Sequence, residues 1–161
     1  MLTVIAGALF LYCVLMIARD DWAFRIVPDR FLLLLVATGA AYALLSSDEG
    51  TIDILSGLAY RAAIPGLLGL AAAALYRVLR GRDGLGLGDV KLMAAAGIWL
   101  PLLESFHAIT VASVAALAVV IAAGAWRGKA TELTQSLPFA VFLGPAFWLL
   151  WIVQEAEALY H

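Results

Sequence analysis

Apolar segments long enough to cross a lipid bilayer constrain this chain more than any other feature. A membrane-spanning helix needs about 20 mostly apolar residues, within a range of about 17–25, and flanking residues can extend a shorter segment. The segments cover Leu2–Ala18, Phe31–Leu45, a stretch from after Asp53 to near Leu79, about 90–103, Ala108–Trp126 and about 138–153. The sequence therefore predicts six transmembrane helices, the third with a kink at Pro65-Gly66.

The composition agrees with a membrane protein and excludes several other classes. Of the 161 residues, 65% are hydrophobic and 14% are charged, whereas soluble domains average roughly 45–50% and about 25%. A soluble chain of this size could not bury so much apolar surface. The net charge of −2 argues against nucleic-acid binding, and the single cysteine, Cys13, excludes an internal disulfide or a Cys-based zinc site. We predict an all-α integral membrane protein in which residues 1–161 form a single polytopic domain.

Basic residues are distributed unequally between alternate connections. Three connections hold nine Lys and Arg residues, whereas the other connections and the tail hold only Arg61 and are mainly acidic. Because basic residues favour the cytoplasmic side, we predict that both termini lie outside and that these three connections lie in the cytoplasm. The nine residues are Arg19, Arg25, Arg30, Arg77, Arg80, Arg82, Lys91, Arg127 and Lys129.

The connection after the first apolar segment carries two adjacent acids. It reads Asp20-Asp21-Trp22-Ala23-Phe24-Arg25-Ile26-Val27-Pro28-Asp29-Arg30. The simplest interpretation is a juxtamembrane turn in which Asp21 pairs with Arg25 four residues later and Pro28 begins the second helix.

The connection before the fourth apolar segment is rich in glycine. It reads Gly84-Leu85-Gly86-Leu87-Gly88-Asp89-Val90-Lys91-Leu92. A phosphate-binding loop would need a preceding strand, and Asp89 would repel a phosphate, so that interpretation fails. A glycine-flanked carboxylate at the start of a membrane helix remains, and a simple helix cap is its structural alternative.

Together the two connections suggest a catalytic pair. Both are predicted on one side of the membrane, and each places an aspartate beside the end of an apolar helix. Two carboxyl groups that share one proton can act as general acid and general base on a peptide bond without a metal or another cofactor. The only histidines, His107 and His161, are predicted on the opposite side, so nucleophilic triads and zinc sites lack their parts.

These connections resemble those of the type IV prepilin peptidases, membrane aspartyl proteases with a Gly-x-Gly-Asp motif. Asp21 lies seven residues before Pro28-Asp29, as the family requires, and the second motif matches Gly84–Leu92 with the small residues and Trp99 that follow. Leu137-Pro138-Phe139 and Gly144-Pro145 resemble a later family segment. Among subfamilies, the chain looks most like the short peptidases of Flp/Tad-type pilus systems and the archaeal preflagellin peptidases.

The resemblance implies roles for individual residues. Asp21 and Asp89 would be catalytic, with Asp89 favoured as the ionised partner because the helix N-terminus stabilises its charge. Gly86 and Gly88 would shape the loop that receives substrate backbone. Lys91 would contact substrate carboxylates or lipid phosphates, with snorkelling toward the interface as the alternative.

The implied activity is removal of the leader peptide from prepilin-like precursors. The enzyme would lie in the cell (inner) membrane as a multi-pass protein, with its active site on the cytoplasmic side. Its partners would be the prepilin-like substrate and membrane lipid, and it would need no cofactor, metal or nucleic acid.

Two other interpretations stay open. A presenilin-like or signal-peptide-peptidase-like protease shares the Gly-x-Gly-Asp motif, but its first aspartate lies mid-helix, whereas Asp21 follows the apolar segment. The second interpretation is a protein without catalytic activity. It would be a membrane subunit of a pilus or secretion assembly, or a small transporter. A transporter should show mid-span charges and an internal repeat, and the sequence shows neither.

Overall fold

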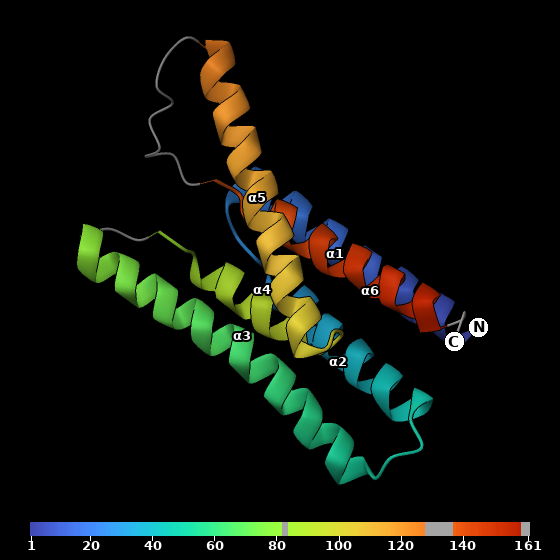
Figure 1. Cartoon of the computed structure of the whole chain (residues 1–161). Coiled ribbons are helices and arrows are strands. Elements are labelled where there is room, and N and C mark those ends of the chain that lie inside the picture. The colour runs from blue at the N-terminus through green and yellow to red at the C-terminus, as the bar shows by residue number, and fades with distance from the viewer. Residues whose placement is uncertain (82–83, 128–136, 159–161) are drawn as a thin grey trace.

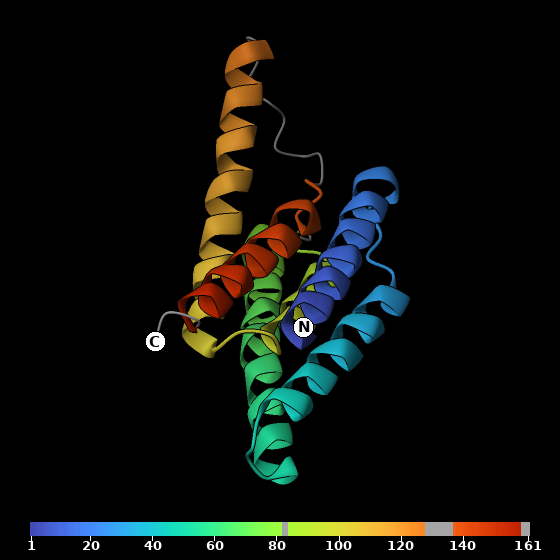
Figure 2. The same cartoon turned by 90° about the vertical axis from the view of Figure 1, so that its right-hand side faces the viewer.

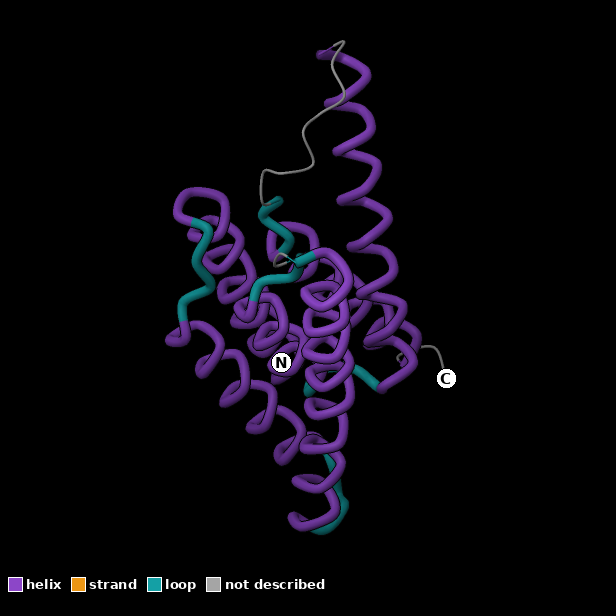
Figure 3. The backbone as a smooth tube through the Cα atoms, turned by 90° about the vertical axis from the view of Figure 1, so that its left-hand side faces the viewer, coloured by secondary structure: helices purple, strands orange, loops and turns teal. Residues whose placement is uncertain are grey.

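The computed structural model describes residues 1–81, 84–127 and 137–158, and within these residues the chain is all-helical. The predicted basic residues Arg82 and Lys129, and His161, lie outside the described residues. The first two connections, residues 25–28 and 47–50, are short (Figure 3). The helices are α1 (Leu2–Phe24), α2 (Asp29–Ser46), α3 (Thr51–Arg80), α4 (Leu87–Gly97), α5 (Leu102–Arg127) and α6 (Ala140–Ala158).

Within the described residues, four helices, α1, α2, α3 and α5, are long and apolar enough to cross a membrane. The fourth predicted segment, about 90–103, differs from the structure, because α4 begins at Leu87 and already ends at Gly97. Its 11 residues extend only about 16 Å, roughly half of a bilayer's hydrocarbon core. Four candidate spans are therefore shown, and six spans stay a prediction.

Helices α1 and α6 form a close pair (Figures 1 and 2). The pair is close because glycines replace larger side chains where the helices meet. A Cβ on Gly7 would lie 2.7 Å from the ring of Trp151, and one on Gly144 would lie 2.7 Å from Val14. The indole nitrogen of Trp148 donates a hydrogen bond to the carbonyl oxygen of Gly7 at 3.0 Å. The small residues thus set the distance between α1 and α6, and the candidate site lies where the end of α1 meets the start of α6.

An aromatic cluster fills the middle of the molecule. Phe10 stacks on Trp99 with ring centroids 4.4 Å apart, and Trp151 meets Trp99 edge-on at 5.5 Å. The Trp99 indole donates a hydrogen bond to the carbonyl oxygen of Leu35 at 3.1 Å, which anchors the end of α4 to α2. This cluster fixes α4 among α1, α2 and α6.

Helix α4 also lies against α3 at a proline. Pro65 has no N–H, so the carbonyl oxygen of Arg61 loses its usual donor within the helix. Gly97 occupies this position, and a Cβ there would lie 2.5 Å from that oxygen. Helix α3 continues through Pro65 as one helix, and its backbone and α4 meet closely only because residue 97 has no side chain.

The later part of α5 extends away from the other helices (Figures 1 and 2). Its apolar side chains, such as Val114, Leu117 and Ile121, are exposed. In water such a surface would be a liability, whereas in a membrane it faces lipid. This exposure agrees with the apolar composition of the chain.

We expect Gly97→Ala to lower the stability of the protein by about 1–3 kcal/mol, because its Cβ meets rigid backbone that cannot move aside. Thermal unfolding in detergent measures the effect. Gly57→Ala is the matched control, since a Cβ at that helical glycine meets nothing within 4 Å. The packing account fails if both variants unfold at the wild-type temperature.

Candidate active site

Asp21 lies on the last turn of α1, and its side chain points inward. The residue is 6% exposed, whereas the neighbouring Asp20 turns toward Arg30 and pairs with it at 3.5 Å. Helix α1 ends because Arg25 adopts a left-handed conformation (φ 57°), and its N–H bonds to the carbonyl oxygen of Asp21 at 3.0 Å. The helix end therefore holds the two adjacent acids in different environments.

The buried carboxylate of Asp21 bonds to a distant part of the chain. Its Oδ2 accepts a hydrogen bond from the backbone N–H of Ala140, the first residue of α6, at 3.1 Å. The simple interpretation predicted an ion pair with Arg25, and the described ion pairs contain none between these two residues. An amide at a helix N-terminus stabilises a nearby carboxylate through its hydrogen bond and the helix dipole.

Asp89 lies in the first turn of α4 and is also buried, at 9% exposure. Gly86 precedes the helix in an extended conformation (ψ 143°), so the carboxyl group of Asp89 lies over the start of its own helix. Its Oδ1 is buried and has no hydrogen-bond partner in the described part of the chain. An unpartnered buried oxygen of this kind is costly unless it carries a proton or meets a substrate or a water.

The two carboxyl groups form one electrostatic unit, here called the aspartate pair. Burial and then the charge of Asp21 raise the pKa of Asp89 to about 6, while the backbone amides of Gly86 and Ala140 act in the opposite direction. The Ala140 amide thus lies between both side chains. The sequence favoured Asp89 as the ionised partner, whereas burial and the charge of Asp21 both act against ionisation of Asp89. Which partner is ionised stays a prediction.

Gly88 allows the two connections to meet. A Cβ on Gly88 would lie 2.8 Å from Cγ2 of Val27, in the connection that follows Asp21. At Gly86 a Cβ would lie 3.2 Å from Oδ2 of Asp89. Close packing beside the aspartate pair therefore explains why both positions are glycine. Their contact with substrate stays a prediction.

Lys91 lies at the surface beside this site. Its Nζ donates to Oδ1 of Asp29 at 2.8 Å, and both side chains are more than half exposed. Asp29 is the first residue of α2, so this ion pair ties α2 to α4. A shallow groove of about 300 Å³ runs from this ion pair along Leu32, Leu33 and Val36. Direct contact between Lys91 and a substrate stays a prediction.

The sequence did not identify the Ala140 amide as part of the site. An amide carries no side-chain signal, and only the resemblance of Leu137-Pro138-Phe139 to a family segment indicated this region. Ala140 is fully buried, and the N–H of Leu143 bonds to the carbonyl oxygen of Phe139 at 3.0 Å, which fixes the first turn of α6.

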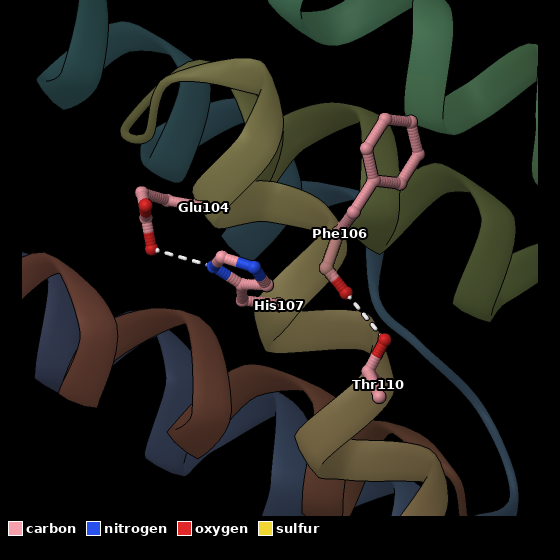
Figure 4. A network of polar contacts seen from close by, with 4 residues as sticks. All are labelled: Glu104, Phe106, His107 and Thr110. Atoms are coloured by element: carbon pink, nitrogen blue, oxygen red, sulfur yellow. Dashed lines mark hydrogen bonds and ion pairs between the residues drawn. The ribbon is translucent and has the colours of Figure 1, made fainter.

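Other polar groups lie apart from the aspartate pair. On the first turns of α5, His107 Nδ1 lies 3.1 Å from the Glu104 carboxylate, and the Thr110 hydroxyl donates to the carbonyl oxygen of Phe106 (Figure 4). Among the described residues, no group of three or more His, Cys, Asp or Glu side chains could hold a metal ion. Among the described residues, the aspartate pair is the candidate for acid–base chemistry.

Comparison with known proteins places the chain in a family. The model of the type IV leader peptidase family matches residues 8–121, which include both aspartates. The chain belongs to this family. Membership makes it a protease and favours the leader-peptidase interpretation over the presenilin-like protease and the non-catalytic subunit.

Several relatives are similar over most of the chain. The leader peptidase HopD of Escherichia coli is 31% identical over 144 residues, with 86% of this chain and 87% of HopD aligned. The prepilin leader peptidase/N-methyltransferase of Xanthomonas campestris is 30% identical over 154 residues, and the alignment covers 89% of this chain but 48% of that protein. No solved structure matches the chain.

The raised pKa of Asp89 predicts how stability depends on pH. An unfolded aspartate titrates near 3.9. The stabilisation that comes from protonated Asp89 is therefore fully present below that pH and is lost as the pH rises through about 6. Asp89→Asn cannot ionise, so it should show a weaker pH dependence and exceed the wild type at pH 8 by up to about 3 kcal/mol. Thermal unfolding between pH 4 and 8 measures this, and an unchanged pH dependence in the variant would disprove the assignment.

Proposed function

We propose that this protein is an aspartyl endopeptidase that removes leader peptides from prepilin-like precursors at the cytoplasmic face of the membrane. The observation that carries the proposal is the aspartate pair: two buried carboxyl groups, 68 positions apart in the sequence, meet at the N–H of Ala140. Family membership supports the leader-peptidase activity.

The arrangement suggests which carboxyl group does what. Asp21, held by the Ala140 amide, is the ionised base that removes a proton from water as the water attacks the scissile carbonyl carbon. Asp89, the partner with the raised pKa, donates its proton in a hydrogen bond to the carbonyl oxygen. When the C–N bond breaks, the proton taken up by Asp21 passes to the leaving amine. The unpartnered Oδ1 of Asp89 is available for such a contact.

The position of the pair supports cleavage at a membrane boundary. Asp21 follows the apolar segment of α1, and Asp89 precedes most of the apolar residues of α4. The excess of basic residues in the neighbouring connections supports the cytoplasmic side. We propose six spans with both termini outside, in which the short α4 crosses only together with the residues that follow it.

The substrate class follows from this position. A site open to the cytoplasm at the membrane boundary suits a precursor with a polar leader inside the cell and a hydrophobic segment in the membrane. The resemblance points to Flp/Tad-type pilins and to cleavage after a small residue, usually glycine. The alignment with HopD along most of both chains supports a short leader peptidase.

Asp21→Asn and Asp89→Asn should each abolish leader removal while the protein remains folded and inserted. Loss of general acid–base help lowers a rate about 10²–10⁴-fold, and loss of the group that activates water should approach complete loss. Co-expression with a candidate prepilin, followed by the gel shift on leader loss, measures this. Asp20→Asn is the matched control, because its side chain pairs with Arg30 instead. Full activity in either of the first two variants would remove the aspartyl mechanism.

Reporter fusions test the proposed topology. Fusions after Glu49, after Glu104 and at the C-terminus should report the outside, and fusions after Arg25 and Gly84 should report the cytoplasm, because basic residues mark the cytoplasmic connections. A cytoplasmic C-terminus would contradict six spans with an outer N-terminus.

A further inference from the structure

A second cavity lies at the far end of α6 from the aspartate pair. It has a volume of about 390 Å³ and is lined by the end of α2, the first half of α3, the end of α4 and the last turns of α6. Ala140, at the aspartate pair, and Gln154, in the cavity wall, are fourteen residues apart on α6, or about 21 Å. The cavity is therefore separate from the proposed catalytic site.

Two polar groups in the cavity wall lack partners. One is a hydrogen-bond acceptor and the other is a cation. The side-chain oxygen of Gln154 is buried and accepts no hydrogen bond from any described residue. The partly buried Arg61 has no ion pair among the described residues, although Glu49, Asp53 and Glu155 line the same cavity. An occupant that satisfies both groups must carry an N–H donor for Gln154 and an anionic acceptor for Arg61.

The position of Arg61 strengthens this requirement. It lies ten residues after Thr51 on α3, a candidate membrane span, which corresponds to about 15 Å along the helix axis. The charge distribution counted Arg61 with the connections, whereas the structure places it within α3. An arginine inside a membrane span is unfavourable unless it is paired or lines a polar cavity. The guanidinium group binds phosphate well, because its planar set of donors matches the phosphate oxygens.

Other residues in the lining of the cavity suit an ammonium group. The Tyr42 hydroxyl donates to Oε2 of Glu155 at 2.7 Å, which fixes that carboxylate beside Gln154. Glu49 and Asp53 also line the cavity, and their carboxylates attract an ammonium group. The bond from Tyr42 to Glu155 links α2 to α6, whose described backbones do not come into contact with each other.

We propose that this cavity binds the headgroup of a phosphoethanolamine lipid. Arg61 binds the phosphate, and Gln154 and Glu155 accept hydrogen bonds from the ammonium group. The primary amine distinguishes this ligand from choline, whose methylated nitrogen has no N–H to donate. A membrane lipid is favoured over a soluble phosphoethanolamine, because the cavity lies between helices of an integral membrane protein.

Native mass spectrometry of the full chain tests the proposal. The protein is taken from vesicles of equal parts dioleoyl phosphatidylethanolamine, phosphatidylcholine and phosphatidylglycerol, and the retained lipid is identified. We expect phosphatidylethanolamine to be retained at least threefold over each other lipid. Arg61→Gln and Gln154→Leu should each reduce retention about tenfold, as expected for a lost hydrogen bond to a charged group. Glu104→Gln, an acid outside the cavity, is the matched control.

Each other outcome overturns the proposal. Equal retention of all three lipids indicates a water-filled cavity, and preferential retention of phosphatidylglycerol indicates an anion site without an ammonium side. Displacement of bound lipid by soluble glycerophosphoethanolamine at equal concentration would favour the soluble ligand. If a variant fails to fold, the lipid that the wild-type protein retains still tests the proposal. Leader cleavage by the aspartate pair is scored separately, so failure of the lipid site leaves the proposed protease activity intact.

Discussion

Two carboxyl groups that are buried close together cannot both be ionised without a large electrostatic cost. Three helices hold the aspartate pair in this buried position. Helix α1 ends at the left-handed Arg25 just after presenting Asp21, α4 begins just before Asp89, and α6 begins with the Ala140 amide between them. The amide stabilises charge on Asp21, while burial and the charge of Asp21 raise the pKa of Asp89 to about 6. In the proposed mechanism these groups are an acid and a base made from the same residue type, distinguished only by their surroundings.

Close packing at small residues maintains this arrangement. Gly7 and Gly144 set the distance between α1 and α6, and Gly97 lets α4 lie against the backbone of α3 at Pro65. Small residues have this role in membrane proteins because hydrophobic burial does not drive helices together in lipid. The aromatic cluster around Trp99 then fixes the short α4, which is too short to be positioned by the bilayer alone.

Much of this could be predicted from the sequence, for identifiable reasons. The apolar segments predicted helices, and four of them are candidate spans. The glycine-flanked Asp89 and the spacing from Asp21 to Pro28 selected two aspartates that the structure brings together. The Ala140 amide could not be found, because a backbone donor has no residue signature and lies 119 positions from Asp21. The ion pair of Lys91 with Asp29 and the early end of α4 likewise depend on tertiary packing, which local sequence patterns do not encode.

The most direct test of the aspartate pair is to titrate it spectroscopically. Infrared difference spectra of the protein in lipid report the C=O stretch of a protonated carboxyl group, which Asp89→Asn identifies by its loss. The account predicts a midpoint near pH 6 for Asp89 in the wild type, and a lower midpoint in Asp21→Asn, because the neighbouring negative charge is gone. An Asp89 midpoint that is the same in the wild type and in Asp21→Asn would show that the two carboxyl groups are not coupled and would contradict the account.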